Sequence, residues 1–240
     1  MKIRAFKAID DLDSCRRFAL GHEEVLASIG IEKVTSSDHG WFHNPEVYVI
    51  ILEQDGKVFG GARIHVTNGE YELPLEEAVG RLDPNIYGII RSEGNFRSGE
   101  ICGLWSANEF AGKGLSILLA RASLAKAGVS LANQLKIKTL YSLMAPWTLR
   151  TATKMGFEIL RTVGDNGSFS YPRPDLKATV VVLHDTDSLV KARDDERNVI
   201  NDLRNRPVQE RQEQIFLGKD VYDVSYELFI DGLDLNNKNI

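Results

Sequence analysis

The spacing of apolar residues changes along the chain between the period of strands and the period of helices. Residues 1–9 predict a strand, residues 10–30 predict a helix, and residues 46–66 predict a hairpin around Asp55-Gly56. The later elements follow in this order: a short helix entered through Pro74, a strand at 99–107, a helix at 115–127, a strand at 137–145, a helix at 146–156, and strands at 157–163 and 178–185. This order predicts an α/β (α+β) domain whose mixed sheet is covered by helices.

The composition changes after the last of these strands, where residues with both signs of charge become dense. A narrow apolar stripe predicts exposed helices that break at Pro207, and the stripe consists of Leu189, Val199, Ile200 and Leu203. Residues 220–230 either add a strand or dock on the domain, and the tail at 234–240 is predicted to be disordered. We therefore expect a domain over 1–184 and a charged helical C-terminal extension over 185–240.

Charge, cysteine usage and hydropathy exclude several classes of protein. The 240 residues carry a formal net charge of −5, whereas general nucleic-acid or membrane-surface binders are usually basic. Cys15 and Cys102 follow no metal or redox spacing, and the five histidines are scattered, so no metal site is expected. The N-terminus lacks the apolar core of a signal peptide, and no run approaches roughly 18 apolar residues. These features predict a cytoplasmic protein without a membrane span or a nucleic-acid partner.

A glycine-bearing turn runs into an apolar, alanine-rich helix between Glu109 and Gly128, with the sequence EFAGKGLSILLARASLAKAG. The first turn of a helix has unpaired N–H groups and a partial positive charge, so a phosphate binds there readily. Gly112, Gly114 and Ser116 are small enough for a pyrophosphate to sit on successive N–H groups. A tight strand-to-helix turn without a ligand explains the same residues, and the missing Lys-Ser/Thr pair excludes a Walker P-loop.

The segment from 113 to 161 is basic within an acidic chain. It holds eight Lys and Arg residues and one acid, Glu158, so its charge is +7 and the remainder of the chain sums to −12. Such a concentration favours a polyanionic ligand, although each base taken alone more often solvates a helix face. The basic segment therefore supports a phosphate-bearing ligand near the glycine turn.

The strand GEICGLWS, the stretch ANEFAGKGLSILLARASLA and a helix that ends in KMGFEIL resemble, in this order, the acyl-CoA-binding half of the GNAT N-acyltransferases. The signature of that family, Arg/Gln-x-x-Gly-x-Gly/Ala, places Ala111, Gly114 and Ser116 at its three defined positions. The resemblance covers residues 98–163 and implies a GNAT-like mixed, mostly antiparallel sheet flanked by helices. Ala111 departs from the signature and removes one side-chain contact to a phosphate.

The resemblance implies that coenzyme A or acyl-CoA is the acyl donor and that two segments hold it. The backbone of the turn would cradle the pyrophosphate, and this turn consists of Ala111, Gly112, Lys113, Gly114, Leu115 and Ser116. The Lys113 side chain would reach a phosphate. The strand with Leu104, Trp105 and Ser106 would pair its backbone with the pantetheine arm, although a core position explains Trp105 as well.

The segment VYVIILEQDGKVFGGARIHVTNGEYELP, followed by GEICGLW, distantly resembles the acyl-homoserine lactone synthases and the related N-acyl amino acid synthases. These enzymes share the GNAT-like fold and take acyl groups from acyl carrier protein or acyl-CoA. Arg63 matches the arginine of their G..R strand, and Glu100 matches the glutamate of their E..R strand. Gly103 stands where that family has an arginine, which argues against lactone formation.

An amine has to lose a proton before it attacks a thioester, and Glu100 is the base that we predict for this step. At pH 7 deprotonation costs about 4.6 kcal/mol for a lysine-like amine and about 1.4 kcal/mol for an α-amine. Strand alternation predicts that Glu100 shares a face with Leu104 and Ser106, and a backbone N–H near Ser106 would hold the oxyanion. Many GNAT enzymes carry a tyrosine acid at the position of Ala152, so Tyr141 is the predicted substitute. A solvated or salt-bridged glutamate and a core tyrosine are the alternatives.

Three hypotheses of function follow. The first is an N-acyltransferase that moves an acyl group from acyl-CoA to the amine of a small molecule by direct attack on the thioester. The second is an amino acid N-acyltransferase fed by acyl carrier protein, or an autoinducer-synthase-like enzyme. The third is an inactive module that binds coenzyme A or a partner protein. The segment HGWFHNP, which begins at His39, either lines an acceptor pocket, covers an acyl chain or plugs the sheet, and the charged helices over 186–230 suggest a homodimer.

Overall fold

The computed structural model describes residues 1–31, 34, 39–67, 70–92, 97–107, 117–214 and 221–233. Within these residues one mixed sheet holds ten strands, which are β1 (Lys2–Lys7), β2 (Val47–Gln54), β3 (Lys57–Val66), β4 (Arg97–Ser106), β5 (Ile137–Met144), β6 (Glu158–Ile159), β7 (Ser168–Ser170), β8 (Lys177–Leu183), β9 (Val208–Gln214) and β10 (Val221–Glu227). The helices are α1 (Leu12–Ser28), α2 (Pro74–Val79), α3 (Asn85–Arg91), α4 (Ile117–Gln134), α5 (Pro146–Lys154) and α6 (Asp194–Asn205), with the short 3-10 turns η1 (Ala8–Asp10) and η3 (Gly40–His43).

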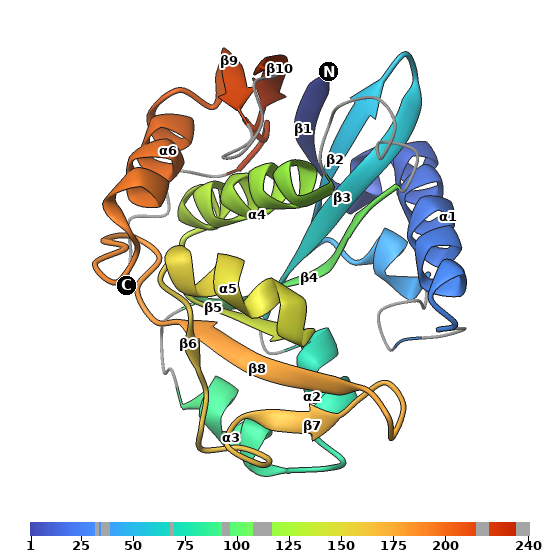
Figure 1. The fold of residues 1–240 in the computed structure, drawn as a ribbon, viewed down its shortest axis with the longest axis vertical. Coiled ribbons are helices and arrows are strands. Elements are labelled where there is room, and N and C mark those ends of the chain that lie inside the picture. The colour runs from blue at the N-terminus through green and yellow to red at the C-terminus, as the bar shows by residue number, and fades with distance from the viewer. Residues whose placement is uncertain are drawn as a thin grey trace.

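The strand order across the sheet is β6-β8-β5-β4-β3-β2-β1-β10-β9, and β7 also pairs with β8 (Figure 1). β4 runs parallel to β5 and β1 runs parallel to β10, whereas the other paired strands are antiparallel. The predicted mixed, mostly antiparallel sheet flanked by helices is therefore confirmed. The sequence pattern missed α3, and the strand predicted at 157–163 is reduced to the two residues of β6.

Helices cover both faces of the sheet (Figure 1). α4 lies across one face and packs on its central strands through an apolar cluster that includes Ile50, Ala62, Ile64 and Ile101. α1 and η3 cover the opposite face around Phe18, Trp41 and Trp105, and α2 with α3 covers the part of that face formed by β5 and β8. None of the helices in the described part of the chain is long and apolar enough to cross a membrane.

α4 is longer than the helix predicted at 115–127, because it continues past Gly128 to Gln134. The glycine lets the helix backbone approach the sheet. A Cβ built at Gly128 would lie 2.4 Å from Cδ1 of Ile101 on β4. Gly128 is therefore a site of close packing between α4 and β4 and not the end of the helix.

α1 packs so closely on β4 that Gly21 leaves no room for a side chain. A Cβ built at Gly21 lies 2.1 Å from Cη2 of the buried Trp105 side chain. Gly21→Ala is therefore expected to lower the free energy of unfolding by about 1–3 kcal/mol. Gly88, inside α3, has no heavy atom within 4 Å of such a Cβ, so Gly88→Ala is expected to raise it by about 0.4–1 kcal/mol. Urea unfolding measures both effects, and equal losses in the two variants would contradict this account.

The C-terminal residues differ from the predicted pair of exposed helices. α6 forms, but it packs on α4 in the same chain, and three residues of the predicted stripe are each 0% exposed, namely Leu189 before the helix and Ile200 and Leu203 within it. After Pro207 the chain forms β9 and β10, which extend the sheet beside β1. β9 is polar on both of its faces, so its sequence shows no strand periodicity, and pairing with β10 determines its conformation.

Three expectations about this part of the chain stay predictions. The tail at 234–240 lies outside the described residues. The homodimer over 186–230 has no test in a single chain, and the stripe that suggested it is occupied by α4. The boundary at 184 separates residues that contribute to one continuous sheet, since β10 pairs with β1.

Candidate active site

β4 and β5 pair over their first halves and then separate. Their parallel ladder reaches Glu100, which lies opposite Tyr141, and within the described residues no ladder pair joins the two strands beyond that point. One residue further, the Ser142 hydroxyl donates a hydrogen bond of 2.7 Å to the carbonyl oxygen of Ile101. From there β4 continues beside β3 and β5 continues beside β8 (Figure 1). We call this point of separation, at Glu100 and Tyr141, the β4–β5 fork.

A β-bulge interrupts the alternation of side chains in β4 beyond the fork. The register with β3 shifts so that Gly103 and Leu104 both lie opposite Ala62. Gly103 has a φ of 59°, which a glycine adopts without strain. The extra residue of such a bulge leaves a backbone N–H outside the ladder and reverses the face to which the following side chains point.

The bulge overturns the expected shared face of Glu100, Leu104 and Ser106. Glu100 points to the α2 side of the sheet, where it accepts a hydrogen bond from the backbone N–H of Leu75. Leu104 packs into the cluster on the α4 side, and Ser106 Oγ accepts a hydrogen bond from Nε of Arg121 on α4. The prediction was wrong because strict alternation takes no account of a bulge.

The two predicted catalytic residues, Glu100 and Tyr141, lie side by side at the fork. Glu100 is 2% exposed, and its Oε2 accepts the Leu75 hydrogen bond at 2.6 Å. Burial raises the pKa of Glu100 to about 8; Leu75 and Arg63 oppose the rise and the Glu76 carboxyl adds to it. Tyr141 is fully buried in the apolar cluster beneath α2. The fork thus holds a carboxyl that changes protonation state near neutral pH.

Arg63 is a fully buried cation on the same face of the sheet. Its guanidinium lies 4.2 Å from the ring centre of Trp41 and 5.5 Å from that of Phe18, so both rings make cation–π contacts. It also hydrogen-bonds Cys102, whose pKa burial raises to about 12, so this thiol is not a thiolate at neutral pH. A Cβ at Gly103 would lie 3.3 Å from Nε of Arg63, so a larger residue at 103 would compete with Arg63 for space.

A small cavity of about 10 Å³ lies beside Arg63 on the α1 face, lined by Phe18, Ala19, His22, Glu23, His39, Trp41 and Arg63. His39 stacks on Phe42, with ring centres 5.0 Å apart, and its Nε2 lies 2.9 Å from Oε1 of Glu23. Burial lowers the pKa of His22 to about 4, and Arg63 adds to this shift, so the ring is neutral at pH 7. The pocket therefore combines aromatic walls, one buried cation and a carboxylate.

Sequence reasoning found part of this pocket. His39 and Trp41, from the segment that begins at His39, line this cavity, whereas Trp41 and Phe42 also pack into the core, so the three interpretations of the segment stay predictions. Arg63, which the resemblance singled out, lies beside them. The contributions of α1 were missed, namely His22 and Glu23. Their signal was the helical spacing, because Phe18 and His22 are four residues apart and therefore share one face of α1.

The predicted donor-binding residues fall into three groups. The turn from Ala111 to Ser116 lies outside the described residues, so its role stays a prediction. Trp105 is 1% exposed and meets the Phe18 ring edge-on at 5.9 Å, so its side chain belongs to the core. Ser106 ends β4 and is held by Arg121 at 3.1 Å.

Arg121 is a half-buried base near the N-terminal end of α4, and sequence reasoning counted it without giving it a role. Burial lowers its pKa, and within the described ranges it forms no ion pair with a carboxylate. Other bases of the segment 113–161 do have such partners: Lys126 lies 3.7 Å from Glu196 of α6. The C-terminal residues therefore balance part of the basic segment and leave the charge of Arg121 available.

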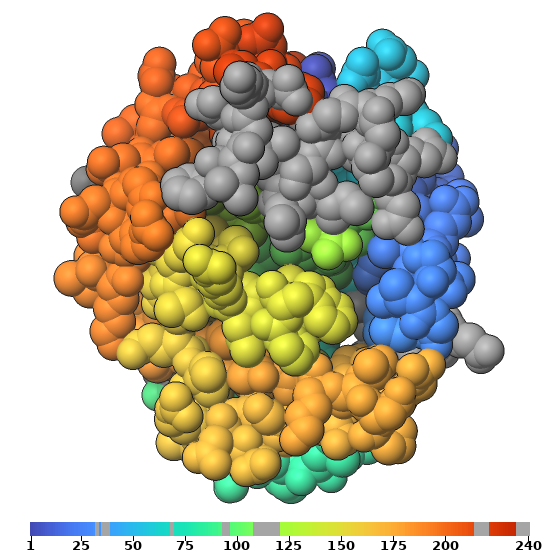
Figure 2. All heavy atoms as spheres, in the orientation of Figure 1, coloured from blue at the N-terminus to red at the C-terminus, as the bar shows by residue number. Residues whose placement is uncertain are grey.

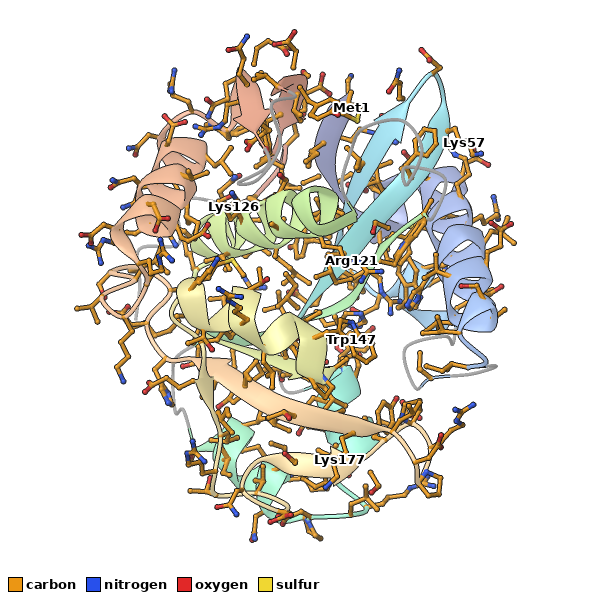
Figure 3. The ribbon with its side chains drawn as sticks, viewed as in Figure 1. Met1, Lys57, Arg121, Lys126, Trp147 and Lys177 are labelled. Carbon is orange, nitrogen blue, oxygen red and sulfur yellow. The ribbon has the colours of Figure 1, made fainter. Side chains whose placement is uncertain are left out.

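The molecular surface is hollowed on the side of the fork. Figure 2 shows a hollow with green atoms of the β4 and α4 region at its floor, bordered by α5 in yellow and α1 in blue. Arg121 lies beside α4 and Trp147 at the first turn of α5 in Figure 3, both on this side of the molecule. Trp147 is 63% exposed. The hollow therefore lies between α1, α4 and α5.

Comparison with known proteins adds evidence on the fold. No protein-family model and no curated protein matches the sequence. Among solved structures, FeeM, an N-acyl amino acid synthase from uncultured soil microbes, is 17% identical with a TM-score of 0.55, over 79% of this chain and 99% of that chain. An acyl-CoA N-acyltransferase from Pseudomonas aeruginosa is 12% identical with a TM-score of 0.52, over 76% of this chain and 99% of that chain.

Acyl-homoserine lactone synthases are also among the solved structures with a similar fold. BjaI, a CoA-dependent acyl-homoserine lactone synthase with SAM and isopentyl-CoA, is 14% identical with a TM-score of 0.51, over 89% of this chain and 94% of that chain. At these identities the similarity establishes the fold. The chain therefore has a GNAT-like fold, similar to that of GNAT acyltransferases, acyl-homoserine lactone synthases and an N-acyl amino acid synthase, as both resemblances implied.

Proposed function

We propose that this chain is an N-acyltransferase that moves an acyl group from acyl-CoA to the amine of a small molecule. The observation that carries the proposal is the β4–β5 fork, which opens directly beyond the buried carboxyl of Glu100. Strands that separate leave backbone N–H and C=O groups to which an extended arm can pair. The pantetheine arm pairs with β4 over Leu104–Ser106, and the turn from Ala111 to Ser116 holds the pyrophosphate.

Glu100 acts as the general base in this proposal. It takes the proton of the amine, directly or through a water molecule, and the nitrogen attacks the thioester carbonyl carbon. The C–N bond forms, the C–S bond breaks, and the thiolate of coenzyme A takes a proton for which Tyr141 is the donor. The pKa of about 8 for Glu100 matches that of an α-amine, so proton transfer between them costs little.

The oxyanion that forms on the carbonyl oxygen needs an N–H donor close to Glu100. Ser106 lies six residues further along β4, about 20 Å at the rise of a strand, which is too far for both groups to act on one thioester. The bulge at Gly103 and Leu104 lies nearer and leaves an N–H outside the β3 ladder. We therefore assign the oxyanion donor to the bulge in place of Ser106.

The small cavity beside Arg63 marks the acceptor site in this proposal, and it has to widen to admit a substrate. It opens on the α1 face, and Glu100 points to the same side of the sheet. The donor approaches from the side of α4, so the two substrates meet at the β4–β5 fork. The carboxylate of Glu23 attracts an amine, and the cation of Arg63 attracts an anionic group on the same acceptor.

Binding of free coenzyme A tests the donor half of the proposal. Coenzyme A at 100 times its dissociation constant is expected to raise the free energy of unfolding by about 2.7 kcal/mol. We further propose that the unbalanced charge of Arg121 attracts a phosphate of the donor, so Arg121→Gln is expected to weaken binding about tenfold. Thermal unfolding over a series of coenzyme A concentrations measures both affinities. Arg91→Gln, on α3, removes the same charge far from the fork and serves as the matched control.

Each outcome separates the hypotheses. If coenzyme A and acyl-CoA leave the melting temperature of the wild type unchanged, the acyl-CoA donor is ruled out, and a carrier-protein donor or a partner-binding module replaces it. Turnover of acyl-CoA with a small amine distinguishes an enzyme from a binding module. Equal losses of affinity in Arg121→Gln and Arg91→Gln would attribute the effect to net charge and not to the fork.

A further inference from the structure

We infer that the acyl chain of the donor is short, from acetyl to butanoyl, because the inner end of the β4–β5 fork is closed on three sides. The inference rests on the proposed function, which places the thioester between the bulge of β4 and Glu100. The three sides are the plane of the sheet, the face under α4 and the face under α2. Each is closed by a contact between buried groups of different elements.

The first contact closes the fork in the plane of the sheet. The hydroxyl of Ser142 donates to the carbonyl oxygen of Ile101 at 2.7 Å, and these residues are 4% and 5% exposed. The bond ties β5 to β4 one residue beyond the last ladder pair. An acyl chain that passed this point would leave a buried hydroxyl and a buried carbonyl without partners, which a protein interior disfavours.

The second contact closes the face under α4. The backbone of α4 at Gly128 lies so close to Ile101 that an added Cβ would come within 2.4 Å of Cδ1. Leu124 and Ala127, on the same helix, are 0% exposed. No room for an alkyl chain therefore remains between this part of α4 and the inner end of the fork.

The third contact closes the face under α2. The backbone N–H of Leu75 bonds Glu100 at 2.6 Å, which fixes the start of α2 over the fork. Leu75 and Tyr141 are each 0% exposed, and both belong to one packed cluster with Leu73, Val180 and Val182. This cluster fills the space behind the two catalytic candidates that a longer chain would need.

The length of β4 between the bulge and the closed end of the fork limits the length of the acyl chain. Leu104, at the bulge, lies three residue steps along β4 from Ile101, at the closed end, which corresponds to about 10 Å of strand. That distance has to hold the acyl carbons together with the van der Waals contacts at both of their ends. Acetyl and butanoyl groups fit this space, whereas an extended octanoyl chain together with the van der Waals contacts at its ends is longer than the whole distance.

Titration of the wild-type protein with acyl-CoA thioesters of increasing length tests the inference. Acetyl-CoA and butanoyl-CoA are expected to bind as tightly as free coenzyme A or more tightly. Octanoyl-CoA is expected to bind about tenfold more weakly than acetyl-CoA, because its chain has to displace packed side chains. Calorimetric titration of the full chain gives the dissociation constants. Equal or tighter binding of octanoyl-CoA would overturn the inference, because it would show that a longer acyl chain finds room elsewhere in the protein.

A pair of matched variants tests whether the packed cluster at Leu75 is what closes the fork to longer acyl chains. Leu75→Ala removes volume directly behind the fork, and Phe169→Ala removes volume in the same cluster but on β7. Leu75→Ala is expected to raise the affinity for octanoyl-CoA relative to acetyl-CoA about tenfold, and Phe169→Ala is expected to leave that ratio unchanged. The same gain in relative affinity for octanoyl-CoA in both variants would show that Leu75 does not close the fork specifically. Failure of the wild type to bind even free coenzyme A would instead overturn the proposed function itself.

Discussion

Glu100→Gln is expected to slow acyl transfer by about 10²–10⁴-fold, because the amide cannot take a proton from the attacking amine. The Leu75 N–H still has an oxygen to bond, so the fork is expected to keep its geometry. In the wild type the rate is expected to rise with pH through a midpoint near 8, as the buried carboxyl ionises. Steady-state rates between pH 6 and pH 9 measure both effects.

Glu76→Gln is the matched control for this change. Glu76 is also buried, at 3% exposed, and its carboxyl accepts a hydrogen bond from the Leu73 N–H of the same segment. Its charge raises the pKa of Glu100, so removal of that charge is expected to move the pH midpoint down while turnover persists. Similar losses of activity in the two variants would show that disturbance of α2, and not loss of the base, causes the effect.

The same carboxyl predicts how stability depends on pH. The pKa of Glu100 is about 8 in the fold and near 4.5 in the unfolded chain, so the folded state holds one more proton between these values. The contribution of Glu100 to the free energy of unfolding is therefore greatest below pH 4.5. It declines by about 1.4 kcal/mol per pH unit as the pH rises toward 8. Glu100→Gln is expected to remove this decline, which urea unfolding at several pH values detects.

Trp105→Ala is expected to lower the free energy of unfolding by about 3–5 kcal/mol, the largest loss that we predict for a single substitution. The indole is 1% exposed, meets Phe18 edge-on and fills the space above Gly21. Trp147→Ala is the matched control, because Trp147 is 63% exposed and its loss is expected to cost less than about 0.5 kcal/mol. Chemical denaturation of both variants gives the comparison. Similar costs for the two tryptophans would contradict the core position of Trp105.

Local patterns in the sequence predicted much of the fold. The hairpin of β2 and β3 follows from Asp55-Gly56 between apolar runs, and α5 follows from Pro146 at its start. The candidate base was found because a resemblance singled out Glu100, and its neighbour Tyr141 because the reaction needs an acid. Their direct juxtaposition was not predicted, since the register of a parallel pair depends on contacts between distant parts of the chain.

Features that depend on tertiary structure escaped the sequence. The bulge at Gly103 is one residue long, and a glycine within a strand also occurs at tight bends and where another backbone approaches closely. β9 has polar residues on both faces, so only its pairing with β10 makes it a strand. The special position of Arg121 could not be recognised among eight bases, because its burial and its bond to Ser106 arise only when α4 crosses the end of β4.

The pairing of β1 with β10 has a consequence for biosynthesis. The Ser225 N–H bonds the carbonyl oxygen of Met1, so β1 is fixed by a residue that is synthesised more than 200 positions later. At about 5–20 residues per second, the strand edge of β1 waits on the order of ten seconds or more for its neighbour. During that time the nascent chain presents an open strand edge to other chains. Completion of the sheet is therefore a late, non-local step, which is expected to make folding slow.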